Sequence, residues 1–117
     1  MKQDKNCIFC KMAQKKAPAE FLDETDNFIA VLDKFPKCKG HALVIPKKHY
    51  VTVLDIPSTL GQEMLQLIKK TASKILEEKQ GDGFNLVMNN LPPAGQAVMH
   101  AHIHLIPRRE GDGLNTV

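Results

Sequence analysis

Three of the five histidines in this 117-residue chain fall at alternate positions close to its C-terminal end. They are His100, His102 and His104. Strict alternation with apolar residues over 99–107 predicts a half-buried strand, in which every second side chain points to the same face. The imidazoles would then form one row, about 6.6 Å apart. The residues facing the opposite side, toward a core, would be Ala101, Ile103 and Leu105.

Two kinds of chemistry can use histidines at this spacing. Imidazoles can bind Zn²⁺, Cu²⁺ or Fe²⁺, or a neutral imidazole nitrogen can attack an electrophile such as phosphorus. A nucleophilic histidine needs an acceptor on its other ring nitrogen, so that the attacking lone pair points the right way. An extended strand sets His100 and His104 about 13 Å apart, so one ion on all three histidines would require strong bending. Spacing alone leaves both alternatives open.

The loop before this run favours an anionic substrate. Pro93–Gln96 can supply backbone N–H groups to the oxygens of a phosphate. Gly95 permits close approach of the backbone, and the Gln96 side chain offers both a donor and an acceptor at the mouth of the row.

A second candidate site begins with Cys7 and Cys10, which are two residues apart. This spacing suits half of a zinc site, a redox pair, or two reduced and partly buried thiols. A redox role is favoured beside a βαβ pattern, which this sequence lacks. Cys38 stands alone in a predicted loop, and we assign it no role.

The composition is that of one soluble globular domain covering residues 1–117, with 43% hydrophobic and 25% charged residues. The net charge of +3 is spread along the chain, which suits an anionic small molecule and argues against nucleic acid as a partner. Three cysteines favour a reducing compartment over a disulfide framework. Neither an apolar signal segment in 1–6 nor a membrane span is evident, so we expect a cytoplasmic protein that does not contact membranes.

The elements expected along the chain are short strands and one long helix, an α+β domain built on an antiparallel sheet. One or two helical turns are expected over 11–16. Thr59 and Gln62 have capping-box spacing at the start of the long helix, which ends before Gly81. The expected strands are 21–23, 28–32, 41–46, 84–89 and the histidine run. Expected loops and tail are 33–40, 91–96 and 108–117.

The histidine run resembles the pattern that names the histidine triad, or HIT, superfamily. The resemblance extends over nearly the whole chain in the same order, and the closest likeness is to Hint-like bacterial HIT proteins with an N-terminal Cys-x-x-Cys. Besides the histidine run, the parts of this chain that carry the resemblance are 7–10, 18–19, 32–33, 40–41, 43–49, Asn89 and 94–96.

The resemblance implies a five-stranded antiparallel sheet with one long and one short helix, usually in a homodimer whose sheets join. It also implies a nucleotidyl hydrolase or transferase in which His102 attacks the α-phosphorus of a nucleoside 5′-phosphate derivative. The implied substrate is a purine nucleotide, and we expect it to be adenosine-based. His104 and His41 would orient and polarise His102 and the phosphate. The implied substrate-binding residues are Asp33 at the ribose, Asn89 and Gln96 at the phosphate, and the backbone of Gly95, Ala97 and Val98. Apolar walls would lie near Val31 and Phe35.

For the cysteine pair, the resemblance implies a structural zinc held by Cys7, Cys10, His49 and His100, which leaves His102 free to attack. No organic cofactor is implied. The chain departs from many Hint proteins at Ala97, where a serine hydroxyl is common, and in a short tail that lacks tryptophan.

Two other functions are open to the sequence. A nucleotide-binding or adaptor protein with vestigial activity would accommodate Ala97. A metalloenzyme would place the three alternating histidines on a catalytic ion, and would lose its activity as soon as the ion was chelated.

Overall fold

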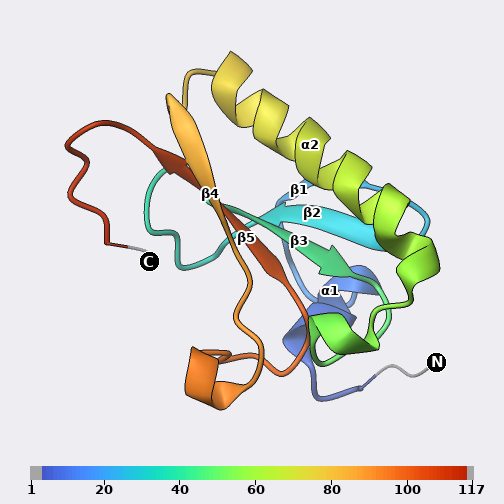
Figure 1. Cartoon of the computed structure of the whole chain (residues 1–117). Helices are drawn as coiled ribbons and strands as arrows, with labels where there is room; N and C mark the ends of the chain where they lie inside the picture. The colour runs from blue at the N-terminus through green and yellow to red at the C-terminus, as the bar shows by residue number, and fades with distance from the viewer. Residues whose placement is uncertain (1–3, 116–117) are drawn as a thin grey trace.

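The strands of the computed structural model, which describes residues 4–115, form one antiparallel sheet in the order β1-β2-β3-β5-β4 (Figure 1). The strands are β1 (Phe21–Glu24), β2 (Phe28–Leu32), β3 (Ala42–Pro46), β4 (Gly83–Val87) and β5 (Ile103–Arg108). The α-helices are α1 (Ile8–Ala13) and α2 (Gly61–Glu77), and three short 3-10 helices cover Val53–Asp55, Ser58–Leu60 and Pro92–Ala94. The expected α+β class and five-stranded sheet are confirmed.

The two α-helices pack on opposite faces of the sheet, so β2 and β3 are buried on both sides. The apolar stripe of α2 packs on alternate residues of β2, β3 and β5, because neighbouring strand residues point to opposite faces. The other face of β2 and β3 packs against α1. The α1-side core contains Phe9, Met12, Ile29, Val31, Leu43 and Ile45.

Strand β5 directs its histidine and its apolar residues to different faces. Ile103 and Leu105 pair with β3 and join the core under α2, as predicted. His104 pairs with Leu43, whose side chain lies on the α1 face. The prediction of one straight row is wrong, because the strand begins only at Ile103 and His100 precedes it in a bend.

Most other boundaries lie within one residue of the prediction, with three exceptions. The short helix starts earlier than expected, at Ile8, where the sulfur of Cys7 accepts from the backbone N–H of Cys10. The Thr59–Gln62 capping box is wrong, because Thr59 already lies in a 3-10 turn that runs into α2. Strand β4 ends at Val87, two residues before the predicted end.

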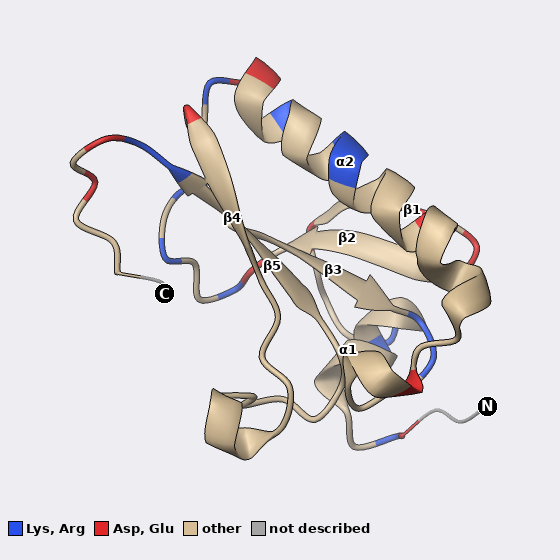
Figure 2. Ribbon diagram, in the orientation of Figure 1, with Lys and Arg blue, Asp and Glu red and all other residues tan. Residues whose placement is uncertain are grey.

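The sequence predicts an irregular tail over 108–117. Arg108 instead belongs to β5, where it pairs with Gly83 of β4. Residues 1–3 and 116–117, parts of the expected N-terminal segment and tail, lie outside the described residues. None of the helices within 4–115 combines the length and the hydropathy that a membrane span requires. Lys and Arg positions are distributed over several elements with Asp and Glu among them (Figure 2).

The start of α2 is fastened to the β1–β2 turn by one carboxylate. Glu63 accepts hydrogen bonds from the Thr25 hydroxyl at 2.6 Å, the Asn27 backbone N–H at 2.8 Å and the Asn27 side-chain amide at 2.9 Å. Replacing Glu63 with alanine leaves these donors without their acceptor. We expect Glu63→Ala to lower the free energy of unfolding by about 2 kcal/mol in urea denaturation.

The matched control is Gln62→Ala, one residue earlier on the exposed side of α2, which should change the free energy of unfolding by less than about 0.5 kcal/mol. Equal effects of the two substitutions would contradict the role given to Glu63.

Candidate functional site

A cavity of about 510 Å³ opens on the α1 side of the sheet. Seven of the residues predicted to bind or transform a substrate line it. They are Asp33, Asn89, Gly95, Ala97, Val98, His102 and His104. His41 and Gln96 lie behind the wall, each at most 5% exposed. The sequence therefore located most of the cavity's polar lining.

The ring of His102 is held by a backbone group. Its Nδ1 lies 2.7 Å from the carbonyl oxygen of His100, and a carbonyl only accepts, so Nδ1 carries the proton and donates it. In the neutral ring the lone pair is then on Nε2. The edge of Phe9 packs against the ring at a centroid distance of 5.0 Å. These contacts fix both the tautomer and the orientation that a nucleophilic imidazole needs.

His41 and His104 form a relay whose tautomers are also set by the backbone. The N–H of Lys37 donates to His41 Nδ1 at 3.0 Å, so His41 carries its proton on Nε2. That Nε2–H donates to His104 Nδ1 at 3.0 Å, which leaves the proton of neutral His104 on its own Nε2. His41 thereby makes His104, whose ring lines the cavity, a hydrogen-bond donor.

Burial keeps this pair neutral. It lowers the pKa of His104 to about 4, with further lowering from nearby His102 and His41. Burial likewise lowers the pKa of His41. Both imidazoles are uncharged at neutral pH, as the relay requires.

Asp33 stands beside the relay. Its Oδ2 lies 3.4 Å from His41 Nε2 and 3.9 Å from His104 Nδ1. These three atoms are close enough to surround a metal ion. However, the proton that Lys37 forces onto His41 Nε2 occupies the lone pair that a metal would need. The cluster is therefore better suited to hydrogen bonding than to metal binding.

The loop 95–98 presents backbone donors to the cavity. Gly95 has a φ of 93°, a left-handed conformation that glycine adopts without strain. The backbone N–H groups of Ala97 and Val98 donate to no acceptor within the described part of the chain. The side-chain amide of Asn89 is likewise without a hydrogen bond to any described residue. These groups are suitable donors for an anion.

One sequence expectation for the cavity, the phosphate contact of the Gln96 side chain, differs from the structure. The Gln96 side chain points into the loop, where it hydrogen-bonds Leu91, Val51 and Val98, so the structure does not bring it to the cavity. The apolar wall was expected near Val31 and Phe35: Val31 itself is buried in the α1-side core, while its neighbour Leu32 and the 88% exposed Phe35 line the cavity.

The sequence reading missed part of the apolar wall. Ile8, Phe9 and Met12 of α1 line the cavity opposite the sheet. Their signal in the sequence is an apolar cluster around the cysteine pair, whose spacing predicted half of a zinc site, a redox pair or two partly buried thiols, and no cavity wall. Leu32 of β2 and Leu43 of β3 line the cavity from the sheet.

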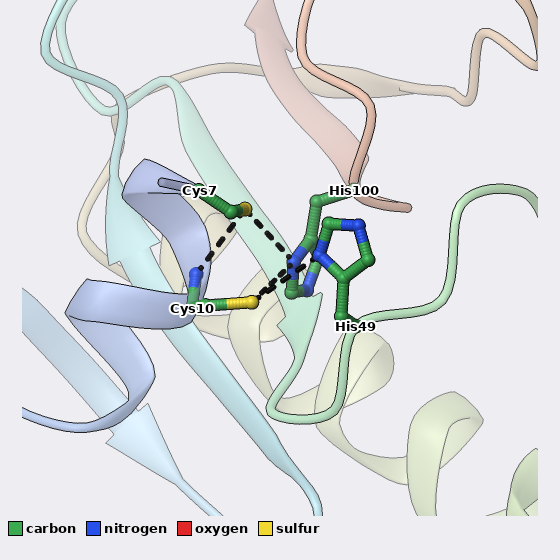
Figure 3. A group of neighbouring side chains, drawn as sticks. All are labelled: Cys7, Cys10, His49 and His100. Atoms are coloured by element: carbon green, nitrogen blue, oxygen red, sulfur yellow. Dashed lines mark hydrogen bonds between the residues drawn. The ribbon is translucent and has the colours of Figure 1, made fainter. Parts of the chain in front are cut away.

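A second cluster lies outside the cavity, where α1 meets the bend before β5 (Figure 3). It contains Cys7, Cys10, His49 and His100, whose ligand atoms all lie within 4.8 Å of one another. Cys7 Sγ is 3.3 Å and Cys10 Sγ 3.5 Å from His100 Nδ1, and Cys10 Sγ is 3.2 Å from His49 Nδ1. Tetrahedral zinc would separate its sulfur and nitrogen ligands by about 3.3–3.8 Å, so the geometry is compatible with zinc.

The chemistry of the cluster also fits a metal. His100 Nε2 lies 2.7 Å from the carbonyl oxygen of Pro46, to which it must donate, so the lone pair of the neutral ring is on Nδ1 and faces the sulfurs. Burial lowers the pKa of His100 to about 4 and keeps it neutral. Burial also raises the pKa of the Cys10 thiol to about 11, which a bound cation would counteract.

Comparison with known proteins agrees with this architecture. Residues 14–111 match the model of the HIT domain. An uncharacterized HIT-like protein of Methanocaldococcus jannaschii is 44% identical over 107 residues, which are 92% of this chain and 82% of that protein. Adenylylsulfatase HINT3 of Arabidopsis thaliana is 38% identical over 109 residues, 93% of this chain and 55% of that protein.

A solved structure described as a Zn-bound histidine triad family protein, from Mycobacterium smegmatis, superposes with a TM-score of 0.86 at 38% identity. The superposition covers 93% of this chain and 79% of that one. Fold, cavity and matches agree: the chain belongs to the HIT family, a superfamily of nucleotide-binding proteins and hydrolases. The resemblance predicted from the sequence is confirmed.

The relay gives a testable dependence of stability on pH. An unfolded histidine binds a proton below about pH 6.5, whereas folded His104 does so only below about 4. Between these values the unfolded state holds more protons, so stability rises with pH and is lost as the pH falls. We expect the His104 contribution to fall by about 1–2 kcal/mol between pH 7 and pH 5.

His104→Asn removes this titration. The difference in the free energy of unfolding between the two pH values, measured in urea, should be smaller in the variant than in the wild type. An unchanged difference would show that His104 is not held neutral in the folded protein.

Proposed function

We propose that this protein hydrolyses or transfers nucleotidyl groups at the α-phosphate of adenylylated substrates, such as nucleoside 5′-phosphoramidates or dinucleoside polyphosphates. The single observation that carries the proposal is the hydrogen bond from His102 Nδ1–H to the His100 carbonyl, which leaves an Nε2 lone pair on a ring that lines the cavity. The relative named as an adenylylsulfatase supports an adenylyl group as the part transferred.

The proposed reaction has two displacements at phosphorus. His102 Nε2 attacks the α-phosphorus and forms an N–P bond, while the bond to the leaving group breaks and its electron pair departs with that group. The ring becomes a nucleotidyl-imidazolium whose positive charge is shared with the His100 carbonyl through Nδ1–H. Water then attacks the phosphorus and forms a P–O bond, while the N–P bond breaks and its electron pair returns to His102 Nε2. The attacking water loses a proton to solvent, the nucleoside monophosphate leaves, and His102 is neutral again.

The negative phosphate oxygens need donors that are already in place. In this proposal the unpaired N–H groups of Ala97 and Val98 and the amide of Asn89 bind those oxygens. Neutral His104 contributes its Nε2–H, because His41 occupies its Nδ1. His41 acts through His104, since it does not reach the cavity surface.

The nucleoside would occupy the remaining part of the cavity. Ile8, Phe9 and Leu32 provide an apolar surface for a purine base. Asp33 is placed to accept hydrogen bonds from ribose hydroxyls through Oδ2, since its Oδ1 already accepts the Phe35 backbone N–H at 3.0 Å.

We also propose that Cys7, Cys10, His49 and His100 hold a structural zinc ion. The ion would supply a rigid link between α1 and the bend that carries His100, and it takes no part in the reaction. Its thiolate ligands are most durable in a reducing compartment, consistent with the predicted cytoplasmic location.

A second copy of the chain is the proposed partner in solution. Strand β4 is at the edge of the sheet and exposes Phe84 and Leu86, which are 37% and 50% exposed. Pairing of two such edges would join the sheets of a homodimer and cover these residues.

A nucleotide-binding protein with vestigial activity is the second candidate, and Ala97 favours it. The residue next to Gln96 offers only its backbone N–H to a phosphate, without a side-chain hydroxyl. The two candidates predict different results. An enzyme should turn over adenosine 5′-phosphoramidate, whereas a binding protein should bind adenosine monophosphate (AMP) with little turnover of the phosphoramidate.

Replacing the nucleophile tests the proposed reaction. His102→Ala should reduce turnover of adenosine 5′-phosphoramidate by at least about 10³-fold, because no other imidazole in the cavity offers a free lone pair. Mass spectrometry of quenched wild-type protein should detect an AMP adduct that the variant lacks. AMP binding and the unfolding temperature should persist in the variant.

The exposed residue Lys48 offers a control, since Lys48→Ala should turn over like the wild type. Wild-type turnover by His102→Ala would eliminate the covalent mechanism. AMP binding without turnover in the wild type would instead support the binding protein.

Metal removal tests the zinc proposal. Purified protein should contain about one zinc per chain, and chelation should lower the unfolding temperature by about 10 °C or more, because metal binding contributes to folding free energy. Cys10→Ser should have the same effect, whereas Cys38→Ser, at the cysteine outside the cluster, should leave the metal content unchanged. Loss of activity on chelation at temperatures where the fold persists would argue for a catalytic ion.

A further inference from the structure

The side chain of Gln96 is buried and uses its oxygen and both N–H groups inside the protein. Its Oε1 accepts from the backbone N–H of Leu91 at 2.6 Å. Its Nε2 donates to the carbonyl oxygens of Val51 at 2.7 Å and Val98 at 3.1 Å. One amide therefore joins the entrance of the loop 91–98, its exit, and the segment that follows His49.

The residue bound by Oε1 has a strained backbone. Leu91 has a φ of 75° and a ψ of 155°, a region that is essentially restricted to glycine. A leucine stays there only where its surroundings hold it. Gln96 binds both backbone groups of Leu91: its Oε1 accepts from the Leu91 N–H, and its own backbone N–H donates to the Leu91 carbonyl at 3.3 Å. The same carbonyl also accepts from the backbone N–H of Ala94 at 3.0 Å.

The same amide constrains the groups next to the proposed phosphate site. The unpaired N–H of Ala97 directly follows Gln96, and the next residue, Val98, is fixed through its carbonyl. That carbonyl accepts from Gln96 Nε2 and also from the backbone N–H of His100 at 2.8 Å. The loop is thereby connected to the residue whose own carbonyl orients His102.

We infer that Gln96 is a positioning residue: it holds Leu91 in a glycine-type conformation and thereby aims the Ala97 and Val98 amides at the phosphate of the substrate. This inference rests on the proposed function. This positioning role replaces the direct phosphate contact expected of the Gln96 side chain, whose hydrogen-bonding groups are all engaged by Leu91, Val51 and Val98. Gln96 touches neither the substrate nor the reacting atoms.

The test compares a ligand that has a phosphate with one that lacks it. Gln96→Met keeps most of the side-chain volume and removes all three side-chain hydrogen bonds. In calorimetric titrations of the metal-loaded protein, we expect AMP affinity to fall about tenfold and adenosine affinity to stay within about twofold of the wild type. A general loss of structure would weaken both ligands alike.

Relief of the strain provides a rescue. Glycine adopts the Leu91 conformation without a clamp, so Leu91→Gly introduced into Gln96→Met should restore part of the AMP affinity. Gln66→Ala, at an exposed position of α2, is the matched glutamine control and should bind both ligands like the wild type. If Gln96→Met does not fold, Gln96→Asn shortens the side chain by one methylene, separates the amide from its three partners without adding charge, and should show the same loss for AMP alone.

The outcomes separate this inference from the function on which it rests. Wild-type AMP affinity in the Gln96 variant, or equal loss of AMP and adenosine, would overturn the positioning role while leaving the proposed function standing. Absence of rescue by Leu91→Gly would overturn the strain-holding role. A wild-type protein that binds neither ligand would overturn the proposed function, and this inference with it.

Discussion

The hydrogen bond from His102 Nδ1–H to the His100 carbonyl decides which nitrogen of that ring is available to a ligand. A neutral imidazole has one lone pair in its ring plane and one N–H, so a partner at one nitrogen determines the character of the other. The same constraint recurs at His100, where the Pro46 carbonyl frees Nδ1, and at His41, where the Lys37 N–H assigns the proton to Nε2. Backbone groups thus set three chemically different roles on one type of side chain.

The bend before β5 is what makes this division possible. A regular strand would have paired the His100 and His102 peptides with neighbouring strands, and their carbonyls would have been occupied by the ladder. Because β5 starts at Ile103, the His100 carbonyl is free to accept from His102, and the His100 ring turns toward the cysteines. His100 therefore belongs to both sites: its ring faces Cys7 and Cys10 in the second cluster, and its carbonyl orients His102 in the candidate active site. Any movement of His100 would also move the carbonyl that orients the His102 ring.

Sequence pattern predicted the sheet and the strand that carries His104 because both depend on local periodicity, whereas Asp33, Asn89 and most other site residues came from the resemblance to the HIT superfamily. The alternation that placed Ile103 and Leu105 in the core also placed His104 on the opposite face. What the pattern could not predict depends on contacts between distant segments. One example is the start of β5 at Ile103. Another is the inward side chain of Gln96, which donates a hydrogen bond to Val51, a residue 45 positions away in the sequence. The Thr59 capping box failed for a local reason, since a 3-10 turn had already begun before it.

The imidazoles of His41 and His104 are neutral, and this neutrality suits the proposed chemistry. A charged imidazole is costly to bury, and burial lowers the pKa of His41 and His104, so the relay holds no charge before a substrate arrives. Backbone and side-chain N–H groups then provide the attraction for an anion without adding a buried charge. Attack on phosphorus would create a positive charge on His102 only at the moment when a negative phosphate is bonded to it. The substrate itself would neutralise the charge that the reaction creates. A site built from neutral groups would therefore stabilise the nucleotidyl-histidine intermediate more strongly than it stabilises the protein before the substrate binds.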